Sequence, residues 1–214
     1  MVKKIGQLLS VFLLAATFAH GQSYLGLFGG LNMSKLSGDV PSKVKYKNSL
    51  GLNFGANLDL RLSETIFLSI QPSYSQEGTK ISYTLNGSSE PIDSVTINLN
   101  YFSLPVLLKI TSGNERFYAL AGIETALLLN SSQTIDDVEQ ELNVEVTELN
   151  VAMQFGVGFR IPVGFPRLFV ELRYSQGLVN LTDDEITLNT IPRVKTSGMK
   201  IIVGIEIPLK RSEN

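Results

Sequence analysis

The sequence contains no cysteine, no tryptophan and only one histidine, His20, among its 214 residues. Without cysteine the chain can form no disulfide, offer no thiolate to a metal and supply no cysteine nucleophile. His20 lies in a segment that we expect to be cleaved, so the mature chain would also lack the imidazole of a Ser-His-Asp triad. These absences exclude the commonest hydrolase mechanisms, and we expect no cofactor and no metal centre.

Charge is also scarce: 18 basic and 20 acidic residues give a net charge of −2, and charged residues make up 18% of the chain. Cleavage would remove Lys3 and Lys4 and leave 16 basic residues against 20 acidic ones. Because phosphate contacts need clustered lysine and arginine, we expect no nucleic-acid partner. The length fits a single domain.

The N-terminus has the three parts of a secretory signal peptide. Lys3 and Lys4 form a short basic region, an apolar core follows from Leu8 to Phe18, and Ala19-His20-Gly21 places small residues at the −3 and −1 positions. We therefore predict a signal peptide at 1–21 and a mature domain at 22–214. The apolar core is shorter than the roughly 20 residues of a membrane span, and no later apolar run reaches about 18 residues.

The mature chain alternates between apolar and polar or small residues. Every even-numbered residue from Leu50 to Leu62 is apolar, and the odd-numbered positions between them hold glycine, asparagine, aspartate or arginine. A period of two predicts β-strands, and the pattern recurs at 148–161 and 197–209. The whole chain predicts eight strands, at about 23–32, 49–62, 65–78, 95–111, 117–129, 148–162, 167–180 and 195–209.

The connections between these strands alternate between short and long. Short turns are expected at 63–64, 112–116 and 163–166, and long polar loops are expected at 33–48, 79–94, 130–147 and 181–194. This alternation is typical of transmembrane barrels, which have short periplasmic turns and long outer loops.

Two barrel types fit strands of this kind. A soluble periplasmic binding barrel would turn its apolar residues inward, whereas a transmembrane barrel turns them toward lipid. The polar faces carry glycine, asparagine, serine, glutamine and isolated charges of both signs, which is typical of a narrow lumen. We therefore predict an all-β fold: an eight-stranded antiparallel up-and-down transmembrane β-barrel in the bacterial outer membrane, with even-numbered residues from Leu50 to Leu62 facing lipid.

Three segments resemble an outer-membrane β-barrel family common in the Bacteroidota, often labelled porin family or PorT-like. The segment Asn100–Lys109 (NYFSLPVLLK) resembles that family's YLEIPLLLK strand, Arg173–Leu181 resembles its penultimate strand, and Gly26–Asn32 resembles its first strand. The resemblance implies the barrel fold and, for PorT-like members, a role in a secretion apparatus. Ser103 stands where the family usually has an acid, and the C-terminus lacks the usual terminal aromatic residue.

Within the strand predicted at 95–111, the apolar residues change from odd positions before Asn100 to even positions after it. A β-bulge near Asn100 to Phe102 would explain the change. The interpretation that we favour is that 95–99 stands above the membrane.

Nine charged residues are expected to face the lumen, and their five basic and four acidic side chains nearly balance. They are Asp59, Arg61, Lys109, Glu124, Arg160, Glu171, Arg173, Lys200 and Glu206. We expect five of them in a layer near the periplasmic turns, Glu124, Glu171 and Arg173 in a middle layer, and Lys200 higher. Because the interior of an eight-stranded barrel is only wide enough for side chains, paired charges would fill it and leave no continuous pore.

The charges therefore indicate an integral outer-membrane protein with a structural or interaction role. A small-solute pore and a soluble periplasmic binding barrel are the alternatives. The basic loop 33–48 and the acidic loop 130–147 are candidates for contact with an envelope protein, although solvated loops would carry the same charges. Asp183-Asp184-Glu185 lacks the ligand spacing of a calcium loop. We expect no enzyme activity, because ion pairing is a better explanation of the inward acids than a catalytic carboxylate pair.

Overall fold

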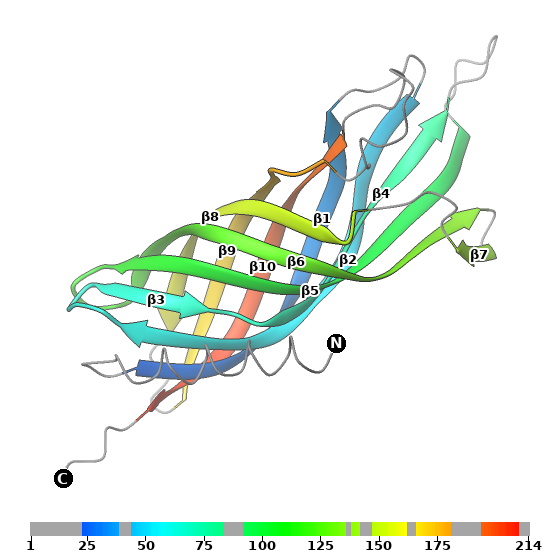
Figure 1. Ribbon diagram of the computed structural model, residues 1–214. Helices are drawn as coiled ribbons and strands as arrows, with labels where there is room; N and C mark the ends of the chain where they lie inside the picture. The colour runs from blue at the N-terminus through cyan, green and yellow to red at the C-terminus, as the bar shows by residue number, and fades with distance from the viewer. Residues whose placement is uncertain are drawn as a thin grey trace.

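The chain forms a closed β-barrel whose strands extend beyond the closed part at one end (Figure 1). The computed structural model describes residues 23–38, 44–83, 92–135, 138–141, 147–161, 166–180 and 194–209. Its strands are β1 (Ser23–Gly38), β2 (Val44–Arg61), β3 (Ile66–Ile70), β4 (Ser73–Tyr83), β5 (Ile92–Thr111), β6 (Phe117–Ile135), β7 (Val138–Glu141), β8 (Leu149–Ile161), β9 (Arg167–Gly177) and β10 (Val194–Leu209).

These ten strands occupy eight positions around the ring. β3 and β4 both pair with β2 and with β5, so together they fill one position. β7 pairs with the outer end of β6, and the pairing of β1 with β10 closes the ring. All pairs are antiparallel, and apart from the closing pair of β1 with β10 they join wall positions that follow each other in the chain, which confirms the predicted up-and-down fold class.

The break between β3 and β4 falls at Gln71 and Pro72, within the single strand predicted at 65–78. The backbone ladder continues across it, because the Gln71 amide donates to the Pro105 carbonyl and the Ala56 amide donates to the Pro72 carbonyl, each at 3.0 Å. The two segments therefore act as one wall strand.

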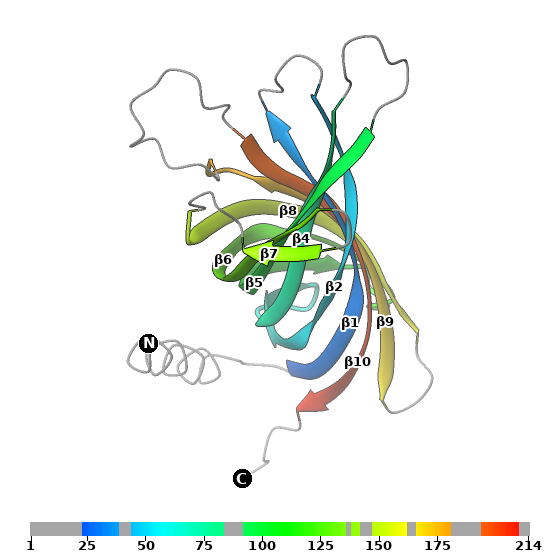
Figure 2. The ribbon, with the colours of Figure 1, turned by 90° about the vertical axis from the view of Figure 1, so that its right-hand side faces the viewer.

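The predicted long outer connections are shorter than expected, because hydrogen-bonded strands continue into them. β1 runs to Gly38 and β2 starts at Val44, so most of the predicted loop 33–48 is strand. β6 likewise runs to Ile135 and is followed by β7, inside the predicted loop 130–147. Outside the membrane both strand faces can be polar, so backbone pairing persists where the apolar alternation has ended. Figure 2 shows the extended ends of β1 and β2 at the upper end of the barrel.

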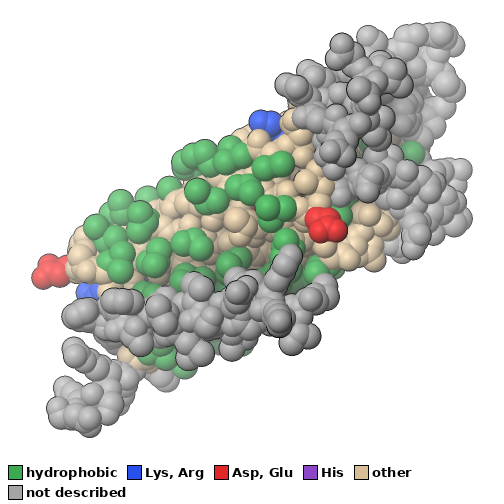
Figure 3. All heavy atoms as spheres, in the orientation of Figure 1, with side chains coloured by type: hydrophobic (Ala, Val, Ile, Leu, Met, Phe, Trp, Pro, Cys, Tyr) green, Lys and Arg blue, Asp and Glu red, His purple; other side chains and the backbone are tan. Residues whose placement is uncertain are grey.

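The outer surface carries the apolar half of the alternation, and Figure 3 shows its hydrophobic side chains on the barrel wall. On β10 the outward residues from Met199 to Leu209 are between 39% and 52% exposed. A soluble protein rarely exposes so large an apolar surface, whereas a transmembrane barrel requires one. None of the described residues forms a helix long and apolar enough to cross a membrane.

The predicted lipid face of β2 is exposed at Leu50, Leu52 and Phe54, and Leu62, which directly follows the strand, is exposed as well. Leu58 and Leu60 differ, since each is only 4% exposed. They lie opposite Ile70 and Leu68 in the pairing with β3. The alternation therefore identifies the face of β2 but not the exposure of every residue on it.

The odd-to-even change of the apolar residues in β5 occurs without a bulge in β5 itself. The register does shift between Asn100 and Tyr101, but the extra residue is Leu129 of β6. Odd-numbered residues of β5 stay buried from Leu99 to Thr111. Leu99 and Tyr101 pack with Ala126 and Val194 into a small apolar core at the outer end of the lumen.

The outward face of β10 provides a test of this orientation. Val203 lies near the middle of the outward apolar row and is 52% exposed. We expect Val203→Arg to destabilise the barrel: its free energy of unfolding in bilayers should fall by about 2–4 kcal/mol if the site is near the midplane. Urea titration of the protein in lipid vesicles measures this, with Val203→Leu as the matched control. Equal stabilities for the two variants would contradict the assignment of this face to lipid.

Candidate functional site: the charged interior

The interior of the barrel contains a network of charged side chains from almost every strand. Strand alternation turns Asp59, Lys109, Arg160, Glu171 and Glu206 inward, and none of these five side chains is more than 3% exposed. Their elements are β2, β5, β8, β9 and β10. A charge buried so completely is stable only when it is paired and hydrogen-bonded, so the contacts among these groups determine what the interior can do.

Six residues of the interior form a closed cycle of contacts. Lys109 Nζ lies 3.0 Å from Asp59 Oδ2 and 3.0 Å from Glu171 Oε1. Arg173 pairs with Glu171 and donates from Nη2 to Gln71 Oε1 at 2.6 Å. Gln71 donates to Ser69 Oγ at 2.8 Å, and Ser69 donates to Asp59 Oδ1 at 2.5 Å. Tyr118 of β6 adds a hydrogen bond of 2.7 Å to Glu171, so both carboxylates are held from several sides.

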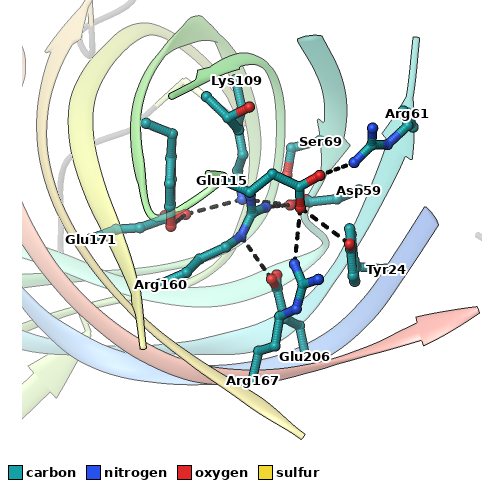
Figure 4. A network of polar contacts seen from close by, with 12 residues as sticks. Tyr24, Asp59, Arg61, Ser69, Lys109, Glu115, Arg160, Arg167, Glu171 and Glu206 are labelled. Carbon is teal, nitrogen blue, oxygen red and sulfur yellow. Dashed lines mark hydrogen bonds and ion pairs between the residues drawn. The ribbon is translucent and has the colours of Figure 1, made fainter. Parts of the chain in front are cut away.

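Arg160 connects this cycle to the rest of the wall. Its Nη2 lies 3.0 Å from Asp59 Oδ2, and its Nε lies 2.7 Å from Glu206 Oε1 (Figure 4). The guanidinium also lies over the rings of Tyr24, Phe67 and Tyr118, at 4.9 to 5.6 Å from their centroids. Cation–π contacts of this kind stabilise a desolvated guanidinium. Arg160 therefore combines two ion pairs with an aromatic enclosure.

Glycines make room for the rings that line this layer. Tyr118 lies opposite Gly158 in the pairing of β6 with β8, and a Cβ on Gly158 would lie 2.2 Å from the Tyr118 ring. Phe169 lies opposite Gly204 in the same way, where a Cβ would lie 2.4 Å from the ring. Any larger residue at either glycine would displace a ring from the interior.

A second, smaller cluster lies nearer the outer end. Lys200 Nζ lies 2.9 and 3.0 Å from the two oxygens of Glu124, and Gln154 donates to Glu124 at 2.7 Å. Glu77 of β4 is also present, and its Oε1 lies 3.8 Å from Lys200 Nζ. In this cluster one lysine therefore faces two carboxylates.

Arg61 is the one predicted lumen residue that does not belong to the buried network. Its side chain is 22% exposed and pairs with Glu115, in the turn between β5 and β6. Glu115 also accepts from Arg167 Nη1 at 3.0 Å and from the Tyr24 hydroxyl at 3.2 Å. Arg61 is close to the end of β2, and its long side chain reaches the periplasmic opening.

The other eight predicted residues all lie in the interior, but some of them share a layer with other residues than we expected. Lys200 shares a layer with Glu124, and Glu171 belongs with Lys109 in the lower layer. The residues predicted from the sequence did not include Glu77, Glu115 and Arg167, nor the neutral partners Ser69, Gln71, Tyr118 and Gln154. Glu77 could have been found, since it continues the inward odd-numbered series of Ser73 and Ser75.

The buried interior has an excess of acids, whereas the predicted set has an excess of bases. The buried charged residues that the structure describes are five acids and four bases, because Glu77 enters the set and Arg61 leaves it. Lys109, Arg160 and Arg173 balance Asp59, Glu171 and Glu206, so the extra negative charge belongs to the outer cluster. No group of three or more acidic side chains in the described ranges could hold a metal ion. The acidic loop residues Asp136, Asp137 and 183–185 lie outside the described residues.

Comparisons with known proteins found a family model and solved structures that match the chain. A family model described as "Outer membrane protein beta-barrel domain" matches residues 18–183. The crystal structure of Neisserial surface protein A (NspA) matches with a TM-score of 0.50 and 13% identity, over 87% of this chain and 99% of that one. The crystal structure of Ail, the attachment invasion locus protein of Yersinia pestis, matches with a TM-score of 0.47 and 14% identity, over 87% and 100%. No curated protein matches the chain.

Removing Arg160 should leave two buried carboxylates short of a cation. We expect Arg160→Met, which keeps much of the side-chain volume, to destabilise the barrel by about 3–5 kcal/mol. The double variant Arg160→Met/Glu206→Gln should recover part of this loss, because it also removes one of the stranded charges. Arg116→Met, at an exposed turn residue, serves as the control. Urea titration in bilayers measures all three, and an Arg160→Met barrel as stable as the control would contradict the role of this pair.

Proposed function

The chain belongs to the outer membrane protein β-barrel domain family, and from this premise we propose that it is a closed barrel with a structural or interaction role rather than a pore. The fold and the bacterial outer-membrane location follow from the family match and from the apolar outer surface. The interior network is the observation that carries the proposal of a closed lumen. Its residues come from seven of the eight wall positions: β2, β3, β5, β6, β8, β9 and β10.

The size of the interior side chains supports a closed lumen. Arg173, Tyr24, Tyr101, Phe67 and Lys109 are among the largest fully buried side chains. An eight-stranded barrel has an interior just wide enough for its side chains to fill. Arginine and lysine held across the lumen by ion pairs occupy the space that water or a solute would need.

An interaction role is supported by the strand extensions at the outer end. Lys35 of β1, Lys45 and Lys47 of β2 and Lys80 of β4 are all exposed, and Lys47 pairs directly with Lys80 in the ladder. These four side chains give the outer ends of β1, β2 and β4 a basic surface. A partner with an acidic surface would fit it, which agrees with the predicted envelope partner at 33–48. Lys43 and the acidic residues Asp136, Asp137 and Glu145 lie outside the described residues, whereas Glu139 and Glu141 lie in β7.

The finer family assignment rests on the strand that includes Asn100–Lys109. Its resemblance to the PorT-like proteins of the Bacteroidota supports membership of that group and a role beside a secretion apparatus. The pairing of Asp59, Glu171, Glu124 and Glu206 with buried bases supports a protein without enzyme activity, since a catalytic acid or base needs a proton that it can exchange.

Conductance distinguishes a closed barrel from a pore. The purified protein, refolded and inserted into planar bilayers, should show no stable stepwise currents, because the paired side chains block the lumen. A known porin reconstituted in the same bilayers is the positive control. Stable single-channel steps in the nanosiemens range from the wild-type protein would overturn the proposal and favour a small-solute pore.

The same proposal includes a signal peptide at 1–21, which lies outside the described residues. The basic residues Lys3 and Lys4, the apolar core and Ala19-His20-Gly21 support cleavage before Gln22. Intact-mass analysis of protein purified from the envelope should give the mass of 22–214. A mass that retains the first 21 residues would exclude this cleavage site.

A further inference from the structure

The turn between β5 and β6 is tied to three other strands at the periplasmic opening. Its Glu115 pairs with Arg61 of β2 and with Arg167 of β9. The Tyr24 hydroxyl of β1 donates to the same carboxylate at 3.2 Å, and Figure 4 shows the carboxylate between these side chains. Glu115 has a φ of 55°, in the left-handed region that favours glycine, so the turn adopts a conformation that is unusual for glutamate. The contacts therefore hold this turn in a defined position at the end of the lumen.

Positive charge is in excess at this opening. Glu115 is shared by two arginines, and Arg116 follows it directly in the turn. Three guanidinium groups against one carboxylate leave a charge of +2. Glu64, in the turn after β2, is exposed, and its carboxylate forms no ion pair with an arginine in the described ranges. The opening therefore attracts anions from the periplasm.

Several N–H donors of this site have no acceptor in the described part of the chain. Arg116 forms hydrogen bonds there through its backbone alone, so its guanidinium is free to bind a ligand. Asn114 Oδ1 accepts from the Ser112 hydroxyl at 2.7 Å and from the Arg116 amide at 3.1 Å, which leaves the Nδ2 group as a donor. Arg167 donates from Nη1 to Glu115 at 3.0 Å, and no other described side chain accepts from it. These groups match a ligand that brings hydrogen-bond acceptors.

A pocket of about 390 Å³ lies at these groups. Its lining residues are Gly113, Asn114, Glu115, Arg116, Arg160 and Arg167. Arg167 lies opposite Glu206 in the pairing of β9 with β10, and Glu206 is buried in the lumen. Because residues directly opposite each other share a face of the sheet, Arg167 projects toward the inside of the ring. The pocket therefore belongs to the periplasmic opening and not to the lipid-facing wall.

The charge and the donors together favour one class of ligand. Guanidinium groups bind carboxylate and phosphate oxygens through paired hydrogen bonds. We propose that this pocket binds a small dianionic oxyanion from the periplasm, a phosphate or a dicarboxylate, with Arg116 and Arg167 as its ion-pair partners and Asn114 as a further donor. Glu115 positions Arg167 and does not need the ligand, because three donors already contact its carboxylate.

Isothermal titration calorimetry tests the site directly. The purified mature barrel in a non-ionic detergent, at low ionic strength and slightly alkaline pH, is titrated with sodium phosphate and with sodium succinate. We expect saturable binding of at least one of them, and the stronger of the two identifies the ligand as a phosphate or as a dicarboxylate. Acetate and chloride, at the same ionic strength, should bind at least tenfold more weakly because each carries a single charge.

Two variants locate the binding. Arg116→Gln and Arg167→Gln should each weaken it at least tenfold. Lys195→Gln, which removes a partly exposed base at the outer end of β10, should leave it unchanged. If Arg167→Gln does not refold because Glu115 loses a partner, Arg116→Gln still tests the site, since its side chain has no partner in the described ranges.

Three results would overturn the proposal. They are the absence of saturable binding by either dianion, binding that Arg116→Gln leaves as strong as in the Lys195→Gln protein, and equal binding of chloride. None of these outcomes depends on whether the barrel conducts.

Discussion

Asp59 is the group on which the interior of this barrel depends. Lys109 and Arg160 both lie 3.0 Å from its Oδ2, and Ser69 donates to its Oδ1 at 2.5 Å. One fully buried carboxylate thereby joins β2 to β3, which follows it in the chain, and to β5 and β8, which are far from it in the sequence. Its removal would leave two cations in a space without bulk water, where an unpaired charge is far more costly than at a surface. The network therefore constrains the relative positions of the strands in addition to the backbone ladder.

The membrane explains why the polar groups are concentrated inside. The outer surface must be apolar over the width of the bilayer, so the charged half of each strand has only the lumen to face. In eight strands that lumen is narrow, and each side chain must fit both the space and the charges of its neighbours. The glycines opposite Tyr118 and Phe169 leave the space that these rings need, and the contacts of Arg160 show how a charge is matched by its neighbours.

Charge is distributed unevenly along the barrel axis. The middle of the lumen is balanced, whereas the outer cluster holds Glu77 and Glu124 against Lys200. At the periplasmic end Arg61 and Arg167 share Glu115, which leaves an excess of positive charge. The balanced middle layer supports the proposed closed lumen, whereas the charges at the two ends of the barrel are unbalanced.

The sequence alone determined the fold class, the strand positions and which residues point inward, because the period of two is a local property of each strand. It could not determine which charged residues pair with each other, because the ion pairs depend on the stagger and tilt with which the strands close into a ring. Lys200 therefore meets Glu124, Arg61 reaches the periplasmic opening, and Glu77 replaces it among the buried charges. The extended outer strands and the bulge in β6 were also hidden, since backbone hydrogen bonds maintain them without an apolar pattern. Only the closed ring, which brings β4, β6 and β10 around one lysine, decided where the excess negative charge lies.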